Sequence, residues 1–168
     1  DEGNRSYSFE NGMLCDAKKS TLYYYFSPNG AKSITVPDTV EYINESAFEG
    51  YEALEEITLP ISLSDIGYKA FADCTSLKSI PEGLLDACHD ITTVKGMFHG
   101  CTALESIPEG LFANNRNITS FEKTFAECKS LKSIPAGLFS SIGTLTSNIK
   151  FTQCFAECVA LESIPASL

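Results

Sequence analysis

Seven cysteines and two histidines are the residues of this 168-residue chain best suited to metal binding or nucleophilic chemistry. Cys88, His89, His99 and Cys101 form the only metal-like cluster in the sequence. Their spacing matches no standard zinc pattern, in which pairs of close ligands flank a longer loop. Cys101 also belongs to a repeated apolar column described below. We therefore predict no metal site and no cofactor, and we interpret the cluster as a core thiol with polar residues near it.

Acidic residues are concentrated in one early stretch that contains no base. They are Asp38, Glu41, Glu45, Glu49 and Glu52. One interpretation is an acidic patch for a basic partner or for Ca²⁺. The other is a solvated surface around one turn of the chain, which we favour because runs of like charge usually serve solvation. No Asp-x-Asp-x-Asp-Gly spacing supports a calcium loop.

Several classes of function are disfavoured by motif and composition. The chain has no phosphate-binding loop, nucleophile elbow or zinc-binding helix motif, so we do not expect an enzyme. Its net charge of −10 and pI of about 4.6 argue against nucleic acid and anionic membranes as partners. No run of apolar residues approaches the length of about 18 that a transmembrane segment needs.

Five phenylalanines at nearly regular intervals anchor an internal repeat. The same residue types recur three, six and nine positions after each of them. The four columns are Phe48, Phe71, Phe98, Phe125 and Phe155; Tyr51, Cys74, Cys101, Cys128 and Cys158; Leu54, Leu77, Leu104, Leu131 and Leu161; and Ile57, Ile80, Ile107, Ile134 and Ile164. A repeat of this length centred on Leu-x-x-Ile is typical of leucine-rich repeats.

This period predicts a β-rich leucine-rich-repeat solenoid. Each Leu-x-x-Ile segment forms a short strand, and the strands stack as a parallel sheet on the concave face. Short helices or turns, such as residues 44–50 and 67–73, form the other side. We expect one domain, with a cap over residues 1–30 and about five repeats over residues 31–168, of which the last is incomplete.

The first thirty residues predict an N-terminal β-meander cap. Asn11-Gly12 is a strong hairpin signal between residues 7–10 and 13–15, and residues 21–26 form a third strand. The aromatic cluster Tyr23–Phe26 has two interpretations. It forms a binding patch, or its alternate residues pack the cap onto the first coil, and the second is favoured because aromatic residues suit half-buried strands.

Two segments resemble the BspA-type leucine-rich repeat. They are residues 34–48 (ITVPDTVEYINESAF) and 66–77 (IGYKAFADCTSL), and the Asn-Gly-x-Leu turn with a Leu-Tyr-Tyr strand resembles the segment that often precedes such repeats. The later Ile-Pro-x-Gly-Leu-Phe units are longer than the commoner form of this repeat. The resemblance implies a cell-surface or secreted protein of a family common in host-associated bacteria and some protozoan parasites, several members of which are linked to adhesion.

The two residues after each repeat leucine should project from the sheet as a binding face. They are Glu55, Glu56, Lys78, Ser79, Glu105, Ser106, Lys132, Ser133, Glu162 and Ser163. The first of each pair alternates in sign, which predicts a charge ladder with neighbouring Cβ atoms within about 7 Å. We hypothesise that this face binds a protein or glycan, in adhesion or host interaction. The alternative is a structural spacer of a larger surface protein that has no ligand of its own.

Two further predictions concern the ends and the thiols. Cys74, Cys101, Cys128 and Cys158 share one inward column, where parallel Cβ vectors disfavour disulfides, so we expect buried free thiols, with Cys154 packed beside them.

The last coil would expose Phe155, Leu161, Ile164 and Leu168, which predicts end-to-end self-association or cover by a further segment. The start at Asp1 suits a chain whose targeting segment has been removed, and hence an extracellular or cell-surface location.

Overall fold

The computed structural model describes residues 6–27, 29–142 and 148–166. These residues contain seven short strands and no helix. The strands are β1 (Tyr7–Glu10), β2 (Met13–Asp16), β3 (Thr21–Tyr25), β4 (Ser33–Thr35), β5 (Tyr42–Ile43), β6 (Glu56–Thr58) and β7 (Asp65–Ile66). They form a five-stranded sheet in the order β1-β2-β3-β5-β7 and a two-stranded sheet of β4 and β6. The pairs β3–β5, β5–β7 and β4–β6 are parallel.

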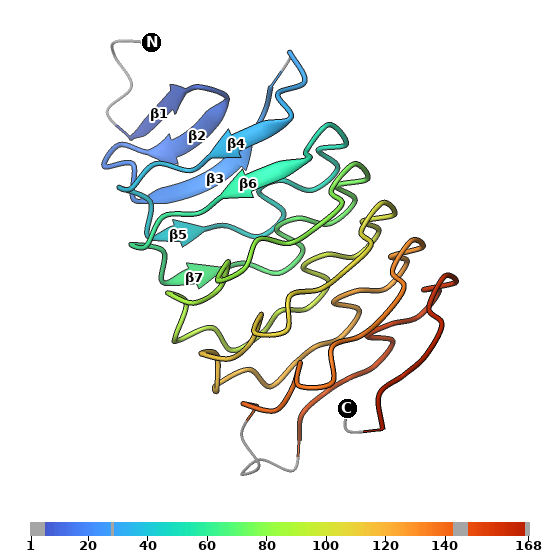
Figure 1. Cartoon of the computed structure of the whole chain (residues 1–168). Helices are drawn as coiled ribbons and strands as arrows, with labels where there is room; N and C mark the ends of the chain where they lie inside the picture. The colour runs from blue at the N-terminus through green and yellow to red at the C-terminus, as the bar shows by residue number, and fades with distance from the viewer. Residues whose placement is uncertain (1–5, 28, 143–147, 167–168) are drawn as a thin grey trace.

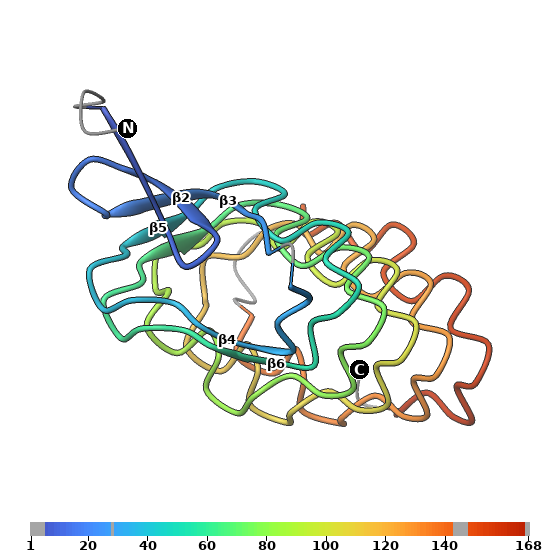
Figure 2. The same cartoon turned by 90° about the horizontal axis from the view of Figure 1, so that it is seen from above.

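The chain winds into coils that lie side by side along one axis (Figure 1). Seen from above, the coils appear as overlapping rings, each displaced a little from the one before, with β4 and β6 on one wall and β3 and β5 on the other (Figure 2). Main-chain hydrogen bonds join each coil to the next, for example Phe71 N–H to the Met97 carbonyl at 3.1 Å and Phe98 N–H to Thr124 at 3.0 Å. The repeats found in the sequence are therefore the stacking units of the structure.

The later coils pair through single residues, such as Ser79 with Ser106 and Ser133 with Ser163. On the β4–β6 wall, proline explains the difference from the early coils. Pro81 follows the repeat isoleucine Ile80 directly, and proline has no N–H to donate to a strand ladder. In the early coils two residues separate the isoleucine from the proline, so β4 and β6 can pair over three residues.

The predicted meander is confirmed. β1, β2 and β3 pair antiparallel in chain order, and the turn between β1 and β2 has left-handed residues, Asn11 (φ 49°) and Gly12 (φ 82°). The inward side chains Met13 and Leu22 are buried. Because β3 also pairs with β5, the meander continues the sheet of the first coil and closes the N-terminal end of the core.

A column of stacked aromatic rings runs through the core. Successive phenylalanines from Phe48 to Phe155 have ring centroids 5.3–5.8 Å apart and interplanar angles of 6–20°. Tyr25 extends the column at its upper end, 5.4 Å from Phe48. It precedes Phe48 by the interval that separates Phe48 from Phe71, and the buried Ile34 follows it as Ile57 follows Phe48. Tyr25 therefore anchors a further, degenerate repeat.

Of the short helices or turns expected before each phenylalanine, the structure has tight turns. The residues two before and two after each phenylalanine have positive φ, between 55° and 73°. They are Ser46, Lys69, Gly96, Lys123 and Gln153 before it, and Gly50, Asp73, Gly100, Glu127 and Glu157 after it. A left-handed residue on each side leaves no room for a right-handed helical turn.

Candidate ligand-binding face

The sequence-predicted binding face lies on the β4–β6 side of the coils. In each repeat the leucine is inward and the two residues that follow it point to solvent, with Glu55 half-buried and the other nine predicted residues exposed. The repeat isoleucine then returns to the core, as Ile57 and Ile80 do, while Ile164 of the last coil is the exception. The Leu-x-x-Ile spacing thus presents two parallel outward rows.

The first row is a charge row whose sign alternates from coil to coil. It begins one coil earlier than the sequence analysis placed it and comprises Lys32, Glu55, Lys78, Glu105, Lys132 and Glu162. Ion pairs join Lys32 to Glu55 at 2.8 Å and Lys132 to Glu105 at 2.7 Å. Backbone hydrogen bonds hold successive members of the row side by side. Glu105 N–H donates to the Lys78 carbonyl at 3.0 Å, and Glu162 N–H donates to the Lys132 carbonyl at 3.1 Å.

Neighbouring charges shift pKa values within the charge row. The hydrogen bond and charge of Lys32 lower the pKa of Glu55, and those of Lys132 lower the pKa of Glu105. The charge of Lys78 also lowers the pKa of both glutamates, so Lys78 interacts electrostatically with the neighbour on each side. Three lysines and three glutamates cancel, so the row is neutral in a strongly acidic chain.

The second row is a serine row, one residue further along each strand. Its members are Ser33, Glu56, Ser79, Ser106, Ser133 and Ser163. Parallel pairing brings Ser33 beside Glu56, Ser79 beside Ser106, and Ser133 beside Ser163. Short side chains in this row keep the surface shallow. We call the charge row and the serine row together the polar face.

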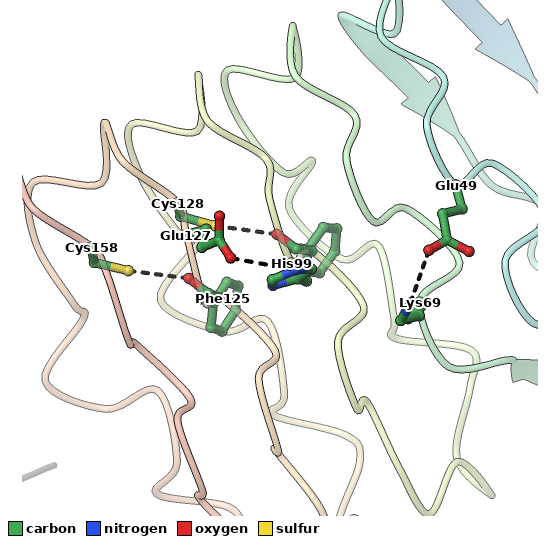
Figure 3. Close-up of polar contacts among 8 residues, drawn as sticks. Glu49, Lys69, His99, Phe125, Glu127, Cys128 and Cys158 are labelled. Carbon is green, nitrogen blue, oxygen red and sulfur yellow. Dashed lines mark hydrogen bonds and ion pairs between the residues drawn. The ribbon is translucent and has the colours of Figure 1, made fainter.

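The predicted acidic residues are spread along one coil, between β4 and β6. Glu49 is paired with Lys69 at 3.0 Å (Figure 3), and hydrogen bonds from Ser46 and Lys69 lower its pKa. A hydrogen bond to Glu45 raises the pKa of Tyr68. Two members of the stretch therefore already have protein partners.

Further ion pairs between coils, which the sequence analysis missed, lie in other turns. Lys95 and Glu122 are 3.0 Å apart. His99 Nε2 lies 3.8 Å from Glu127 (Figure 3), which makes an ion pair when the imidazole is protonated. A signal for the first pair was present, because Lys95 and Glu122 hold equivalent positions in successive repeats. Cross-coil pairing of charge is thus a general feature of this surface.

The predicted buried free thiols are confirmed, and all seven cysteines are free and buried. Each thiol of the inward column donates to the phenylalanine carbonyl of the preceding coil, as Cys128 does to Phe98 at 3.2 Å and Cys158 to Phe125 at 3.1 Å (Figure 3). Burial raises the pKa of Cys101 to about 12. Such thiols are poor nucleophiles because little thiolate forms at neutral pH.

The metal-like cluster of the sequence is not assembled: Cys88 and Cys101 lie at separate sites in the core, His89 is exposed and His99 is half-buried. Cys88 donates to the Leu63 carbonyl at 3.7 Å, whereas Cys101 donates to Phe71 at 3.2 Å. Among the residues that the structure describes, no group of three or more histidine, cysteine or acidic side chains could hold a metal ion. The same column as Cys88 holds a buried amide, Asn115, whose Nδ2 donates to the carbonyl of Cys88 at 2.7 Å.

The last coil is open to solvent, as the sequence predicted. Ile164 is 66% exposed, whereas the equivalent isoleucine of an inner coil, Ile107, is 6% exposed. Leu161 is only partly buried, but Leu104 is fully buried. Leu168, which was also expected at this end, lies outside the described residues.

The repeated units also identify the protein family to which the chain belongs. Residues 19–167 match six copies of the BspA type Leucine rich repeat region, and the chain belongs to this family. The sixth copy agrees with the degenerate repeat anchored by Tyr25. A search of curated proteins finds no match.

Solved structures of bacterial leucine-rich repeat proteins share the fold. A leucine rich cell surface protein from Faecalibacterium prausnitzii A2-165 matches with a TM-score of 0.67 and 24% identity over 96% of this chain and 40% of its own. A leucine-rich repeat protein from Eubacterium ventriosum gives 0.63 and 19% over 100% and 54%. The T. pallidum leucine-rich repeat protein gives 0.61 and 22% over 94% and 66%. The chain thus spans about half the length of the first two.

The described residues include no helix that is long and apolar enough to span a membrane.

Proposed function

We propose that this chain is a non-catalytic, ligand-binding repeat module of a cell-surface or secreted protein, with a role in adhesion or host interaction. In this proposal the coils form a solenoid, the β4–β6 side is concave, and the polar face binds a protein or a glycan. The family and the fold shared with a cell surface protein support this location. The polar face carries glutamate, lysine and serine without the paired base and nucleophile that catalysis needs.

The observation that carries the proposal is the unbroken charge row. Its side chains stand directly before β4, β6 and the single-residue pairs of the later coils, where main-chain hydrogen bonds join one coil to the next, so their spacing is set by the backbone. A row of alternating sign attracts a partner with the complementary series and repels a partner shifted by one coil. The row therefore provides specificity and register, although each exposed ion pair contributes little to stability.

Charge reversal tests the proposal. The chain and its variants Lys78→Glu and Lys132→Glu would be passed over immobilised extracellular-matrix proteins and glycans in a surface plasmon resonance screen. For any ligand that the chain binds, we expect each variant to bind about tenfold or more weakly, because a repulsive contact replaces an attractive one.

Lys129→Glu is the matched control, because Lys129 is exposed in the same coil as Lys132 but lies outside the polar face. It should leave binding unchanged. Equal loss in all three variants would show a general effect of net charge and contradict a binding role for the polar face. Absence of binding to every ligand would instead favour the structural spacer.

A further inference from the structure

A hollow of about 380 Å³ opens at the N-terminal end, where the β1–β2 hairpin meets the end of β3. Its wall combines aromatic rings with small uncharged polar side chains. The residues that matter are Phe9, Tyr25, Phe26, Asn11, Ser27 and Asn29. The volume is near the lower limit of about 300 Å³ for small-molecule sites.

Two aromatic rings at this hollow are available to a ligand. Phe9 is 59% exposed and Phe26 is 56% exposed, whereas Tyr25, which points into the core, is 5% exposed. Exposed aromatic rings of this kind are typical of recognition surfaces. Within the run Tyr23–Phe26, Tyr25 packs against Phe48 while Phe26 stays accessible.

The backbone holds these rings in place. Phe26 N–H donates to the Gly12 carbonyl at 2.7 Å, which ties the hairpin tip to the end of β3. Gly12 has a φ of 82°, and a Cβ at this position would lie 2.5 Å from the Phe26 carbonyl oxygen. Only glycine allows so close an approach, and the resulting contact orients the wall before any ligand arrives.

The hollow is uncharged, which is unusual in a chain with a net charge of −10. No acidic or basic side chain is among its lining residues. The neighbouring Glu10 is already paired with Lys19 at 2.8 Å. By contrast, Glu82 and Asp86 line the hollow between the second and third coils. A neutral ligand is therefore favoured at the N-terminal hollow, because a buried unpaired charge would lack a partner there.

We propose that this hollow binds one or two neutral pyranose units of a glycan. A pyranose presents an apolar C–H face, which suits the rings of Phe9 and Phe26, and a rim of hydroxyl groups, which suits the amides and hydroxyl of Asn11, Asn29 and Ser27. The site is separate from the polar face of the proposed function. Its test uses free sugars, so either proposal can fail alone.

Saturation-transfer NMR on the full chain tests the site, with the methyl glycosides of glucose, galactose, mannose and N-acetylglucosamine as probes. We expect transfer to the C–H protons of at least one of them. Phe9→Ala and Phe26→Ala should each weaken its binding about tenfold, the effect of losing one good aromatic contact. Tyr42→Ala is the control, because Tyr42 is 47% exposed on β5 and outside the hollow, and it should bind normally.

Asn11→Gly removes the amide side chain without disrupting the hairpin turn, since glycine tolerates the φ of 49° at this position. It should weaken binding while the melting temperature stays unchanged. Three results with sugars would overturn the proposal: no saturation transfer to any of the four sugars, equal binding by the Phe26→Ala and Tyr42→Ala variants, or stronger binding of sialyllactose than of lactose. Binding of a decaproline peptide in place of the sugars would assign the hollow to a proline-rich protein segment and equally overturn it.

Discussion

Replacing Gly67 by alanine should destabilise the protein, because the backbones of two neighbouring coils come very close together at Gly67. Its N–H donates to the Ile43 carbonyl at 2.8 Å, next to the β5–β7 pair. A Cβ at this position would lie 2.3 Å from the backbone nitrogen of Glu45 and 2.7 Å from the carbonyl carbon of Asn44.

Neither contact can be relieved by a rotamer change, because all the nearby atoms belong to the backbone. Reaching an ordinary separation of at least 3.4 Å requires the coils to move apart by about 1 Å. Such a shift strains the coil-to-coil hydrogen bonds around β5 and β7. Overpacking of this kind costs about 1–3 kcal/mol, which urea denaturation followed by circular dichroism would measure as a lower midpoint.

Gly110→Ala is the matched control, because its added Cβ would meet only the Ala113 side chain at an ordinary 3.9 Å, and its backbone is not left-handed. This variant should be more stable by about 0.4–1 kcal/mol, since alanine lowers the entropy of the unfolded chain. The two substitutions therefore have opposite predicted signs. If Gly67→Ala unfolds at the same urea concentration as the wild type, the close approach of the two coils is refuted.

Three further outcomes are expected. Burial raises the pKa of Cys101 to about 12 from 9.0, so as pH rises the unfolded chain loses the thiol proton before the folded chain does. The free energy of unfolding should therefore fall as pH rises above 9. Urea titrations at rising pH should show a smaller fall in this free energy for Cys101→Ala than for the wild type. Lys132→Glu breaks the charge row and should lower the urea midpoint at low salt, with partial recovery at high salt and little effect of Lys129→Glu, and equal losses would refute the row. Sedimentation velocity should show end-to-end association that Ile164→Lys abolishes, whereas a monomer at every concentration would contradict association through the open coil.

The inward columns could be predicted from the sequence because each coil buries the same residue types at equivalent positions. A phenylalanine, a cysteine, a leucine and an isoleucine at fixed spacing are buried in successive coils, and one column suffices to align the others. The degenerate first repeat was missed because Tyr25 replaces phenylalanine and Ala31 replaces leucine. Its strand could still be recognised, since Lys32 precedes Glu55 by the same interval that separates Tyr25 from Phe48.

The left-handed conformation within the turns could not be predicted from residue type. The left-handed positions before the phenylalanines carry serine, lysine, glycine and glutamine, and only glycine favours that conformation by itself. The conformation is imposed by neighbouring coils, through bonds such as Lys69 N–H to the Lys95 carbonyl at 3.0 Å. A stack of similar coils supplies these bonds on both sides, and their sum outweighs a strain of about 1–2 kcal/mol per residue.

The two candidate sites differ in what the sequence could reveal about them. The polar face follows from the alternation of inward and outward residues, which a repeat displays several times over. The N-terminal hollow depends on a break in that alternation. Leu22 and Tyr25 both point inward although they are three residues apart, because the pairing of β2 with β3 shifts between Leu14 and Cys15. This irregularity places Phe26 on the outside beside Gly12, so the hollow results from pairing register and could not be derived from composition or spacing.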